Sequence, residues 1–96
     1  MIAIVATIHL KEDRVETFEA IARELEAQVA AREPGCVLYR MTRSRTDPLT
    51  YRSLEIFRDQ AAIDTHVAAD YFRTAARGMR DCVSRESIVE FADTLS

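Results

Sequence analysis

Glycine is scarce in this chain of 96 residues, which contains only Gly35 and Gly78. The G-x-G-x-x-G turn of dinucleotide-binding proteins needs three glycines, and the phosphate-binding loop G-x-x-x-x-G-K-[ST] needs two in close succession. Two glycines so far apart can form neither motif. The sequence therefore excludes the glycine-rich cradles that hold nucleotide phosphates, and we expect no cofactor of that kind.

Cysteine and histidine are equally rare, with two of each. Cys36 and Cys82 lie far apart and form no C-x-x-C, so we interpret them as reduced, packed thiols. A catalytic cysteine would need an activating base that the sequence does not identify. His9 and His66 lack the helical i, i+4 spacing of zinc ligands, so we expect no metal site.

The charge pattern also excludes classes of partner. The formal net charge is -3 and the sequence pI is about 5.3, with basic residues spread along the chain and often next to acids. This pattern predicts neither a nucleic-acid footprint nor an anionic-membrane patch. The apolar start MIAIVATIHL is too short to span a bilayer and lacks a basic region and a cleavage site, so we expect a cytoplasmic protein.

Hydrophobic periodicity predicts a strand over residues 2–10 and then a helix. Asp13-x-x-Glu16 has the form of a capping box at the start of that helix. Glu33-Pro34-Gly35 ends it, because the residue before proline avoids the helical region and glycine permits a sharp turn. The apolar stripe of this helix repeats at three and four residues: Val15, Phe18, Ile21, Ala22, Leu25 and Val29.

Two further alternating stretches, residues 36–45 and 51–57, flank the turn Thr46-Asp47-Pro48 and predict an antiparallel hairpin. Asp59 and Asp70 are expected to cap two helices, the first ending near His66. Alternation over residues 84–91 predicts the last strand.

This order of elements is the split β-α-β unit repeated, an α+β ferredoxin-like sandwich over the single domain 1–96. Helices would cover one face of a four-stranded antiparallel sheet. We expect the open face to carry Tyr39, Met41, Tyr51 and Phe57 or their opposite-face neighbours, and neither set is polar throughout. An open apolar face on a small domain indicates a partner or ligand site, so we predict a homodimer.

His66 is the leading candidate for chemistry, because an imidazole titrates near neutral pH and can take a proton from a phenol or hold a substrate oxygen. The structural alternative is a histidine that caps its own helix or bonds a backbone carbonyl. Tyr71 could donate to a bound oxygen or lie on the surface. Tyr39, Tyr51, Met41, Phe57 and Phe72 fit a pocket wall or a core better than catalysis.

Glu55 shares a strand face with Tyr51 and Phe57. It could orient His66 or a substrate hydroxyl. We favour the alternative, in which Glu55 forms a salt bridge with an arginine such as Arg40 or Arg52 or makes a contact across the dimer, because buried acids more often pair with arginine than act in chemistry.

Three short patterns follow one another along the chain: Glu33-Pro34-Gly35-Cys36-x-x-Tyr39 after the first helix, Glu55-x-Phe57 in the third strand, and His66 with Phe72 six residues on. In this order and spacing they resemble the antibiotic biosynthesis monooxygenase domain family of dimeric α/β barrels. Phe57 stands where the family usually has tryptophan, and Tyr71 stands where a second histidine is common. Haem-degrading relatives have an axial histidine and a tryptophan where this chain has Ala76 and His66, which disfavours haem degradation.

The resemblance covers nearly the whole chain and indicates the fold and the family rather than one reaction. The family includes cofactor-free quinol monooxygenases and the autoinducer-2 degradation isomerase. We expect a cofactor-independent monooxygenase that oxidises a small quinol or polycyclic phenol with molecular oxygen. His66 would be catalytic. The alternatives are a proton-transfer isomerase of a small hydroxyketone and a non-catalytic barrel that binds a small ligand. The expected substrate-binding residues are Tyr39, Tyr51, Glu55, Phe57, Tyr71 and Phe72.

Overall fold

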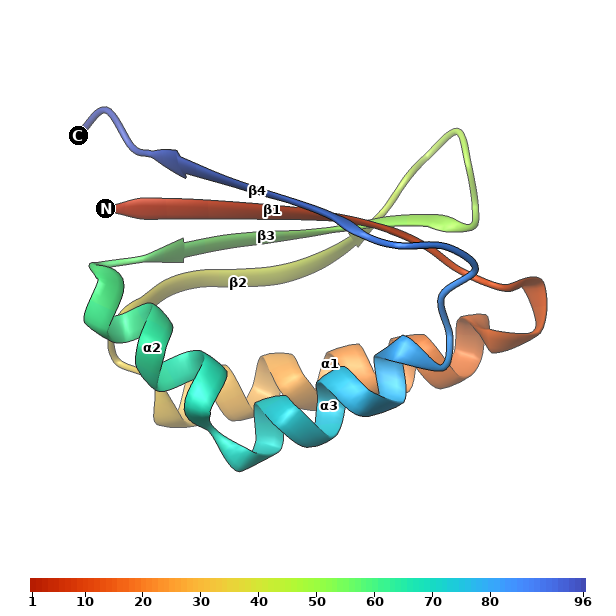
Figure 1. Ribbon diagram of the computed structural model, residues 1–96, viewed down its shortest axis with the longest axis horizontal. Helices are drawn as coiled ribbons and strands as arrows, with labels where there is room; N and C mark the ends of the chain where they lie inside the picture. Colours follow the sequence, from red (N-terminus) through yellow and green to blue (C-terminus); the bar gives the residue numbers. More distant parts are fainter.

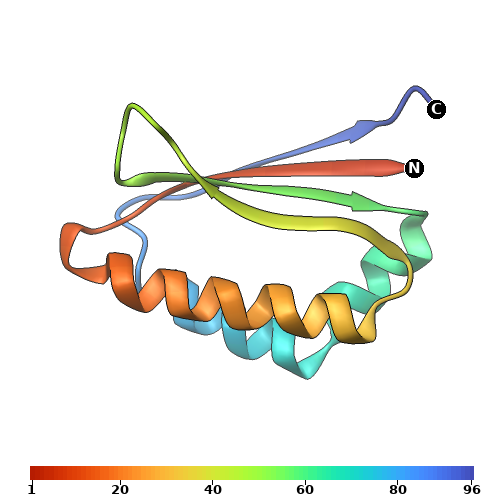
Figure 2. The same ribbon diagram turned by 180° about the vertical axis from the view of Figure 1, so that it is seen from behind.

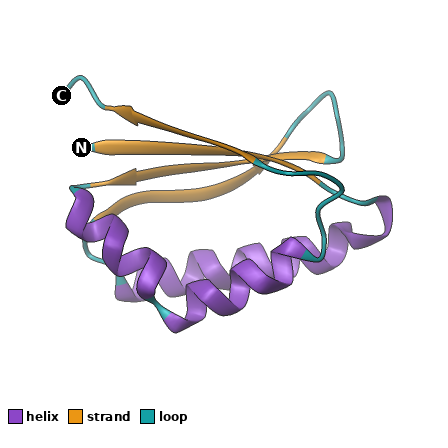
Figure 3. Ribbon diagram, viewed as in Figure 1, coloured by secondary structure: helices purple, strands orange, loops and turns teal.

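The computed structural model describes residues 1–96 and arranges them as a sheet with helices on one side (Figures 1 and 3). Three helices lie beneath the sheet, and no helix is long and apolar enough to cross a membrane. The elements in chain order are β1 (Ile2–His9), the short 3-10 helix η1 (Glu12–Arg14), α1 (Val15–Arg32), β2 (Cys36–Arg43), β3 (Thr50–Phe57), α2 (Gln60–Ala68), α3 (Asp70–Arg80) and β4 (Ile88–Asp93).

The sheet confirms the predicted fold class. Its strand order is β2-β3-β1-β4 and every neighbouring pair is antiparallel. Two consecutive elements, β2 and β3, form the expected hairpin, while β1 lies in the middle and pairs with β4 at the edge. Figure 2 shows α1 running along the underside of the sheet with α3 beside it.

The apolar stripe of α1 is confirmed, since Phe18, Ala22, Leu25 and Val29 are all buried. The predicted capping box is wrong. Asp13 lies inside η1, and the N-cap residue of α1 is Arg14, which makes no side-chain capping bond. The chain enters the helix through a 3-10 turn, in which the Arg14 amide donates a hydrogen bond to the Lys11 carbonyl. This bond satisfies one of the backbone donors that have no partner within the helix.

Gly35 follows α1 for a reason other than the one expected. No glycine in the chain has a positive φ, so the turn does not need glycine's conformational freedom. A Cβ atom at Gly35 would instead meet the Cβ atom of Ala62 at 2.7 Å. Gly35 therefore permits the close approach of α2 to the turn after α1.

The two later helices fit the expected caps in part. Asp59 caps α2, because its side chain accepts a hydrogen bond from the Ala62 amide at 2.9 Å. Asp70 does not cap α3. It is already the first helical residue, and the extended residue Ala69 takes the N-cap position. Ala69 separates the helices because its amide still bonds the His66 carbonyl of α2 while its carbonyl accepts from Arg73 of α3.

Strand boundaries differ from the prediction mainly at the C-terminal end. Strand β4 spans Ile88–Asp93, whereas residues 84–87 are not in a strand. The chain leaving α3 first follows the end of β1, where Val83 bridges Leu10 and the Ser84 amide bonds the His9 carbonyl. Continuous pairing with β1 begins only at Ile88.

Of the two residue sets predicted for the open face, the structure places the second one there, the opposite-face neighbours of Tyr39, Met41, Tyr51 and Phe57. Tyr51 and Phe57 are buried beneath the sheet, and the strand register puts Tyr39 and Met41 on the same, helix-covered side. Alternation defines two sets of side chains, but helix packing decides which set is covered. The set on the opposite side includes four apolar residues that are partly or largely exposed: Leu38, Leu54, Ile56 and Ile88.

Candidate functional site

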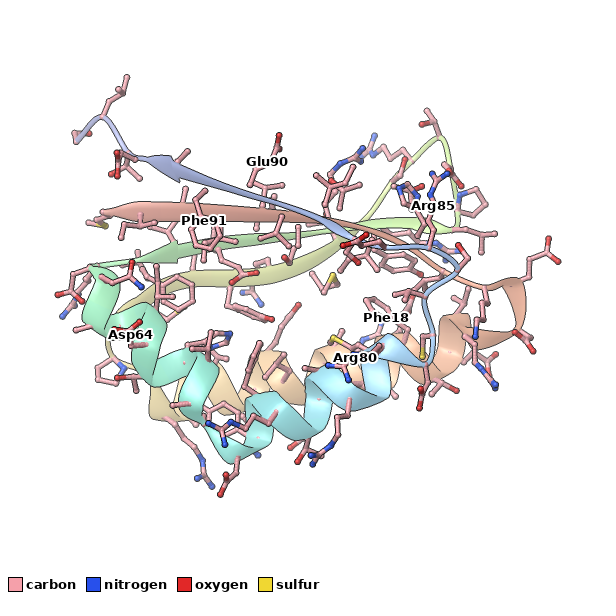
Figure 4. The ribbon with its side chains drawn as sticks, in the orientation of Figure 1. Phe18, Asp64, Arg80, Arg85, Glu90 and Phe91 are labelled. Carbon is pink, nitrogen blue, oxygen red and sulfur yellow. The ribbon has the colours of Figure 1, made fainter.

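A cavity of about 640 Å³ lies between the sheet and the helices. Fifteen of its 21 lining residues are hydrophobic. It is open beneath the edge strand β4, where Phe91 points toward the helices while its neighbour Glu90 points away (Figure 4). The Phe91 side chain lines the cavity and is still 63% exposed, because β4 lies at the rim of the sheet. The cavity volume of about 640 Å³ is typical of sites for small apolar ligands.

His66 lines this cavity and is 3% exposed. The i, i+3 spacing on α2 turns Ile63 and His66 inward together, as expected. The imidazole Nδ1 atom lies 3.0 Å from each carboxylate oxygen of Glu33. The structural alternatives for His66, a helix cap or a bond to a backbone carbonyl, are therefore wrong: its partner is a carboxylate.

Glu33 is absent from the predicted site residues, since the sequence identifies it only as part of the helix stop and of the family resemblance. It is 6% exposed, and its side chain also accepts a hydrogen bond from the Tyr71 hydroxyl. Tyr71 is therefore half-buried and bonded rather than a free surface tyrosine, and it does not line the cavity. Burial and the bond to Glu33 raise the pKa of Tyr71 to about 12, so the phenol stays protonated and remains a donor.

Aromatic rings surround the imidazole. Phe72, Phe57 and Tyr39 have ring centroids 4.5, 5.2 and 5.3 Å from that of His66. Burial raises the pKa of Tyr39 far above its ordinary value, so this phenol stays neutral. Phe72 and Tyr39 also line the cavity, whereas Phe57 is fully buried and does not.

The second ring nitrogen of His66 has no hydrogen-bond partner. Nε2 is buried, and no protein group donates to it or accepts from it. An unpaired buried polar atom is costly, and such atoms are rare in folded proteins. Nε2 belongs to a side chain on the cavity wall, so a ligand in the cavity could satisfy it once the neighbouring rings shift slightly.

Glu55 forms no salt bridge with an arginine of its own chain, so this part of the favoured prediction is wrong. Its carboxylate lines the cavity and accepts a hydrogen bond from the Ser53 hydroxyl at 2.7 Å. Arg52 lies on the opposite side of the sheet, and Arg40 pairs with Glu26 at 3.4 Å. Burial raises the pKa of Glu55, and the Ser53 bond and the nearby His66 offset only part of that shift.

Tyr51 lies outside the site. Its ring packs edge-on against Phe18 at 5.2 Å in the core, and its hydroxyl donates to Glu19. It does not line the cavity that contains His66. The predicted set of substrate-binding residues is thus divided: Tyr39, Glu55 and Phe72 line the cavity, while Tyr51, Phe57 and Tyr71 lie behind its walls.

The two cysteines are unpaired. Burial, together with the nearby Glu33 and Glu55, raises the pKa of Cys36 to about 11, and burial also raises the pKa of Cys82. Both are therefore thiols rather than reactive thiolates at neutral pH. No three histidine, cysteine or acidic side chains lie close enough together to hold a metal ion.

Comparisons with known proteins agree with this fold. The sequence profile described as antibiotic biosynthesis monooxygenase matches residues 1–78. A Caulobacter crescentus crystal structure, named as a candidate antibiotic biosynthesis monooxygenase, is 33% identical and superimposes with a TM-score of 0.95 over 99% of this chain and 90% of that one. Another structure named antibiotic biosynthesis monooxygenase shares the fold at 23% identity, with a TM-score of 0.91 and all of both chains covered.

A curated Synechocystis protein, the uncharacterized protein sll1783, is 25% identical over 89 residues. The match covers 93% of this chain but 60% of that protein.

We predict that Glu55→Gln stabilises the protein in a pH-dependent way. A raised pKa means that the folded protein holds the Glu55 proton more tightly than the unfolded chain does. The ionised Glu55 carboxylate therefore lowers the free energy of unfolding. That cost is absent below the ordinary carboxyl pKa of about 4.3 and grows as pH rises to the raised value. The variant should match the parent near pH 4 and melt about 3–6 °C higher at pH 8.

The control for this measurement is Glu24→Gln, which changes an exposed helical glutamate in the same way. Its melting temperature should follow that of the parent within about a degree at both pH values. Melting of Glu55→Gln that differs equally from the parent at pH 4 and pH 8 would contradict a charge cost at Glu55.

Proposed function

Because this chain belongs to the antibiotic biosynthesis monooxygenase family, we propose that it is a cofactor-independent monooxygenase. Its substrate is a small quinol or polycyclic phenol, and its oxidant is molecular oxygen. The observation that carries the proposal is the unpartnered, buried Nε2 atom of His66, a residue that lines an apolar cavity. His66 is the catalytic residue in this account.

The first step is removal of the phenolic proton. Glu33 is an acceptor when ionised, so its two contacts with Nδ1 require the imidazole proton to lie on Nδ1. Nε2 then has a free lone pair and can accept a hydrogen bond from a substrate hydroxyl and take its proton. The resulting imidazolium is stabilised by the Glu33 carboxylate, as in carboxylate–histidine pairs of hydrolases.

The second step is the reaction of the phenolate with oxygen. A phenolate is electron-rich, and its ring carbon can supply the electrons that reduce oxygen. One oxygen atom becomes the new quinone carbonyl, and the other leaves as water together with the ring hydrogen and the hydroxyl proton. No further reductant is needed. The apolar walls keep bulk water from the anion and from the reduced oxygen intermediate.

The shape of the cavity supports an aromatic substrate. Its volume of about 640 Å³ suits a molecule of two or three fused rings, and most of its lining is hydrophobic. Tyr39 and Phe72 provide ring surfaces next to His66. Glu55 supplies a second polar group on the wall, where it can accept a hydrogen bond from another substrate hydroxyl.

Isomerisation of a small hydroxyketone is the second candidate, and Glu55 favours it. A carboxyl with a raised pKa on the same wall as a free imidazole nitrogen gives two groups that could exchange protons with a carbonyl and its neighbouring carbon. Oxygen uptake with a panel of hydroquinones separates the candidates, because the isomerase would consume none. Binding without turnover of either substrate class would indicate a ligand-binding barrel.

We further propose that the protein is a homodimer assembled through the outer face of its sheet. That face lacks a covering helix, and it exposes Leu54, Ile88 and part of Leu38. A two-fold interface burying ~600–1,000 Å² per chain would remove these side chains from water. The cavity lies on the other side of the sheet, so assembly would leave it accessible.

We predict that His66→Ala lowers turnover of an active hydroquinone by about two to four powers of ten, because the proton acceptor is lost. Oxygen uptake on an electrode measures this directly, and circular dichroism at the assay temperature verifies that the variant is folded. The matched control is His9→Ala, since His9 does not line the cavity. Normal turnover in His66→Ala would end the catalytic role of His66.

We predict that Leu54→Asp converts the dimer to a monomer or an aggregate, because it would bury a charge in the interface. The parent should scatter light as a particle of about twice the 10.9 kDa chain mass at low micromolar concentration. Thr74→Asp, on the exposed side of α3, is the control and should remain dimeric. A monomeric parent would contradict the proposed assembly.

A further inference from the structure

Three elements converge on the Glu33 carboxylate. Glu33 lies in the turn after α1, His66 in α2 and Tyr71 in α3, and the latter two side chains both bond to it. Glu33 and His66 are nearly inaccessible to water, with side chains that are each 3% exposed. A buried carboxylate persists only when donors satisfy it, and here one donor is an imidazole and the other a phenol.

We propose that Tyr71 is a positioning residue that acts through Glu33 to set the protonation state of His66. Tyr71 donates to Oε2 of Glu33, and the shared carboxylate holds a proton on Nδ1 of His66. Nε2 is thereby kept as an acceptor. The proposal about Tyr71 rests on the proposed function only because it takes Nε2 as the atom that contacts the substrate. The arrangement of protons on Glu33, His66 and Tyr71 does not require a bound substrate.

The phenol has a specific effect on the pair. A hydrogen bond to the charged form of an acid favours that form, so the Tyr71 donor spreads the charge of the Glu33 carboxylate. Without the Tyr71 donor, His66 would be the only side chain that donates to the Glu33 carboxylate. The Glu33–His66 pair would then bind an additional proton more readily. The imidazole would then be cationic at a higher pH, and a cationic imidazole cannot accept a substrate proton at Nε2.

Other charged and titratable groups face this cluster from each neighbouring element, and the variants below leave them unchanged. Arg32, at the end of α1, lies over the Tyr71 ring with its guanidinium carbon 5.7 Å from the ring centre. The remaining groups are Cys36 and Tyr39 of β2 and Glu55 of β3.

The test is a titration of the histidine rings by long-range proton–nitrogen NMR on nitrogen-15-labelled protein without substrate. His9 is the only other histidine and serves as an internal reference. In the parent, the neutral His66 ring should carry its proton on Nδ1. Tyr71→Phe should keep that tautomer and raise the His66 midpoint by about one pH unit, a tenfold change in proton affinity.

Glu33→Gln should have the opposite effect, because it removes the negative charge while keeping the size of the side chain. The His66 midpoint should fall, and the preference for the Nδ1 tautomer should weaken. Tyr51→Phe is the matched control, since it deletes a tyrosine–glutamate bond of the same kind, to Glu19, outside the cavity. It should leave the His66 titration unchanged.

Two results would overturn the proposal. One is a parent spectrum in which neutral His66 carries its proton on Nε2, a measurement that needs no variant and holds even if Tyr71→Phe does not fold. The other is a folded Tyr71→Phe protein whose His66 midpoint is unchanged or lower, as expected if Tyr71 only packs against Glu33. Both readings are independent of substrate, so they stand whether or not the protein oxidises phenols.

Discussion

The hydrogen bond between the Glu33 carboxylate and the His66 imidazole is the interaction on which the site depends. It joins the turn after α1 to α2 across 33 residues of sequence, in a place that water does not reach. The close contact of Gly35 with Ala62 brings these two segments together, and the aromatic rings of Tyr39, Phe57 and Phe72 enclose the imidazole. One ring nitrogen is thus fixed by the protein, and the other is left without a partner on the wall of a cavity.

The two faces of the sheet have different roles. The inner face and the helices enclose the apolar cavity, which stays open because the edge strand β4 has no helix beneath its outer part. The outer face exposes apolar residues such as Leu54 and Ile88 and is the surface that we propose for self-association. Strand alternation makes this division possible, because neighbouring residues on one strand serve opposite faces.

Local patterns in the sequence predict the fold well and the site only in part. Apolar periodicity identifies α1 and the strands, and Asp59 identifies the start of α2. Alternation places Tyr51 on the same strand face as Glu55 but does not show which residues of that face line the cavity, so the prediction includes Tyr51 although it packs in the core. Glu33 could not be recognised from local sequence, because a glutamate before Pro-Gly also fits a simple helix end and its partner is distant in the chain.

A crystal structure of the protein with a slowly oxidised two-ring phenol, such as 2-naphthol, tests the central claim most directly. We predict that the rings occupy the cavity between β4 and the helices and that the phenol oxygen lies about 2.6–3.2 Å from Nε2 of His66. The Glu33 bond to Nδ1 should be unchanged. A naphthol bound in the cavity with its hydroxyl directed to the open side, and Nε2 still without a partner, would contradict this account.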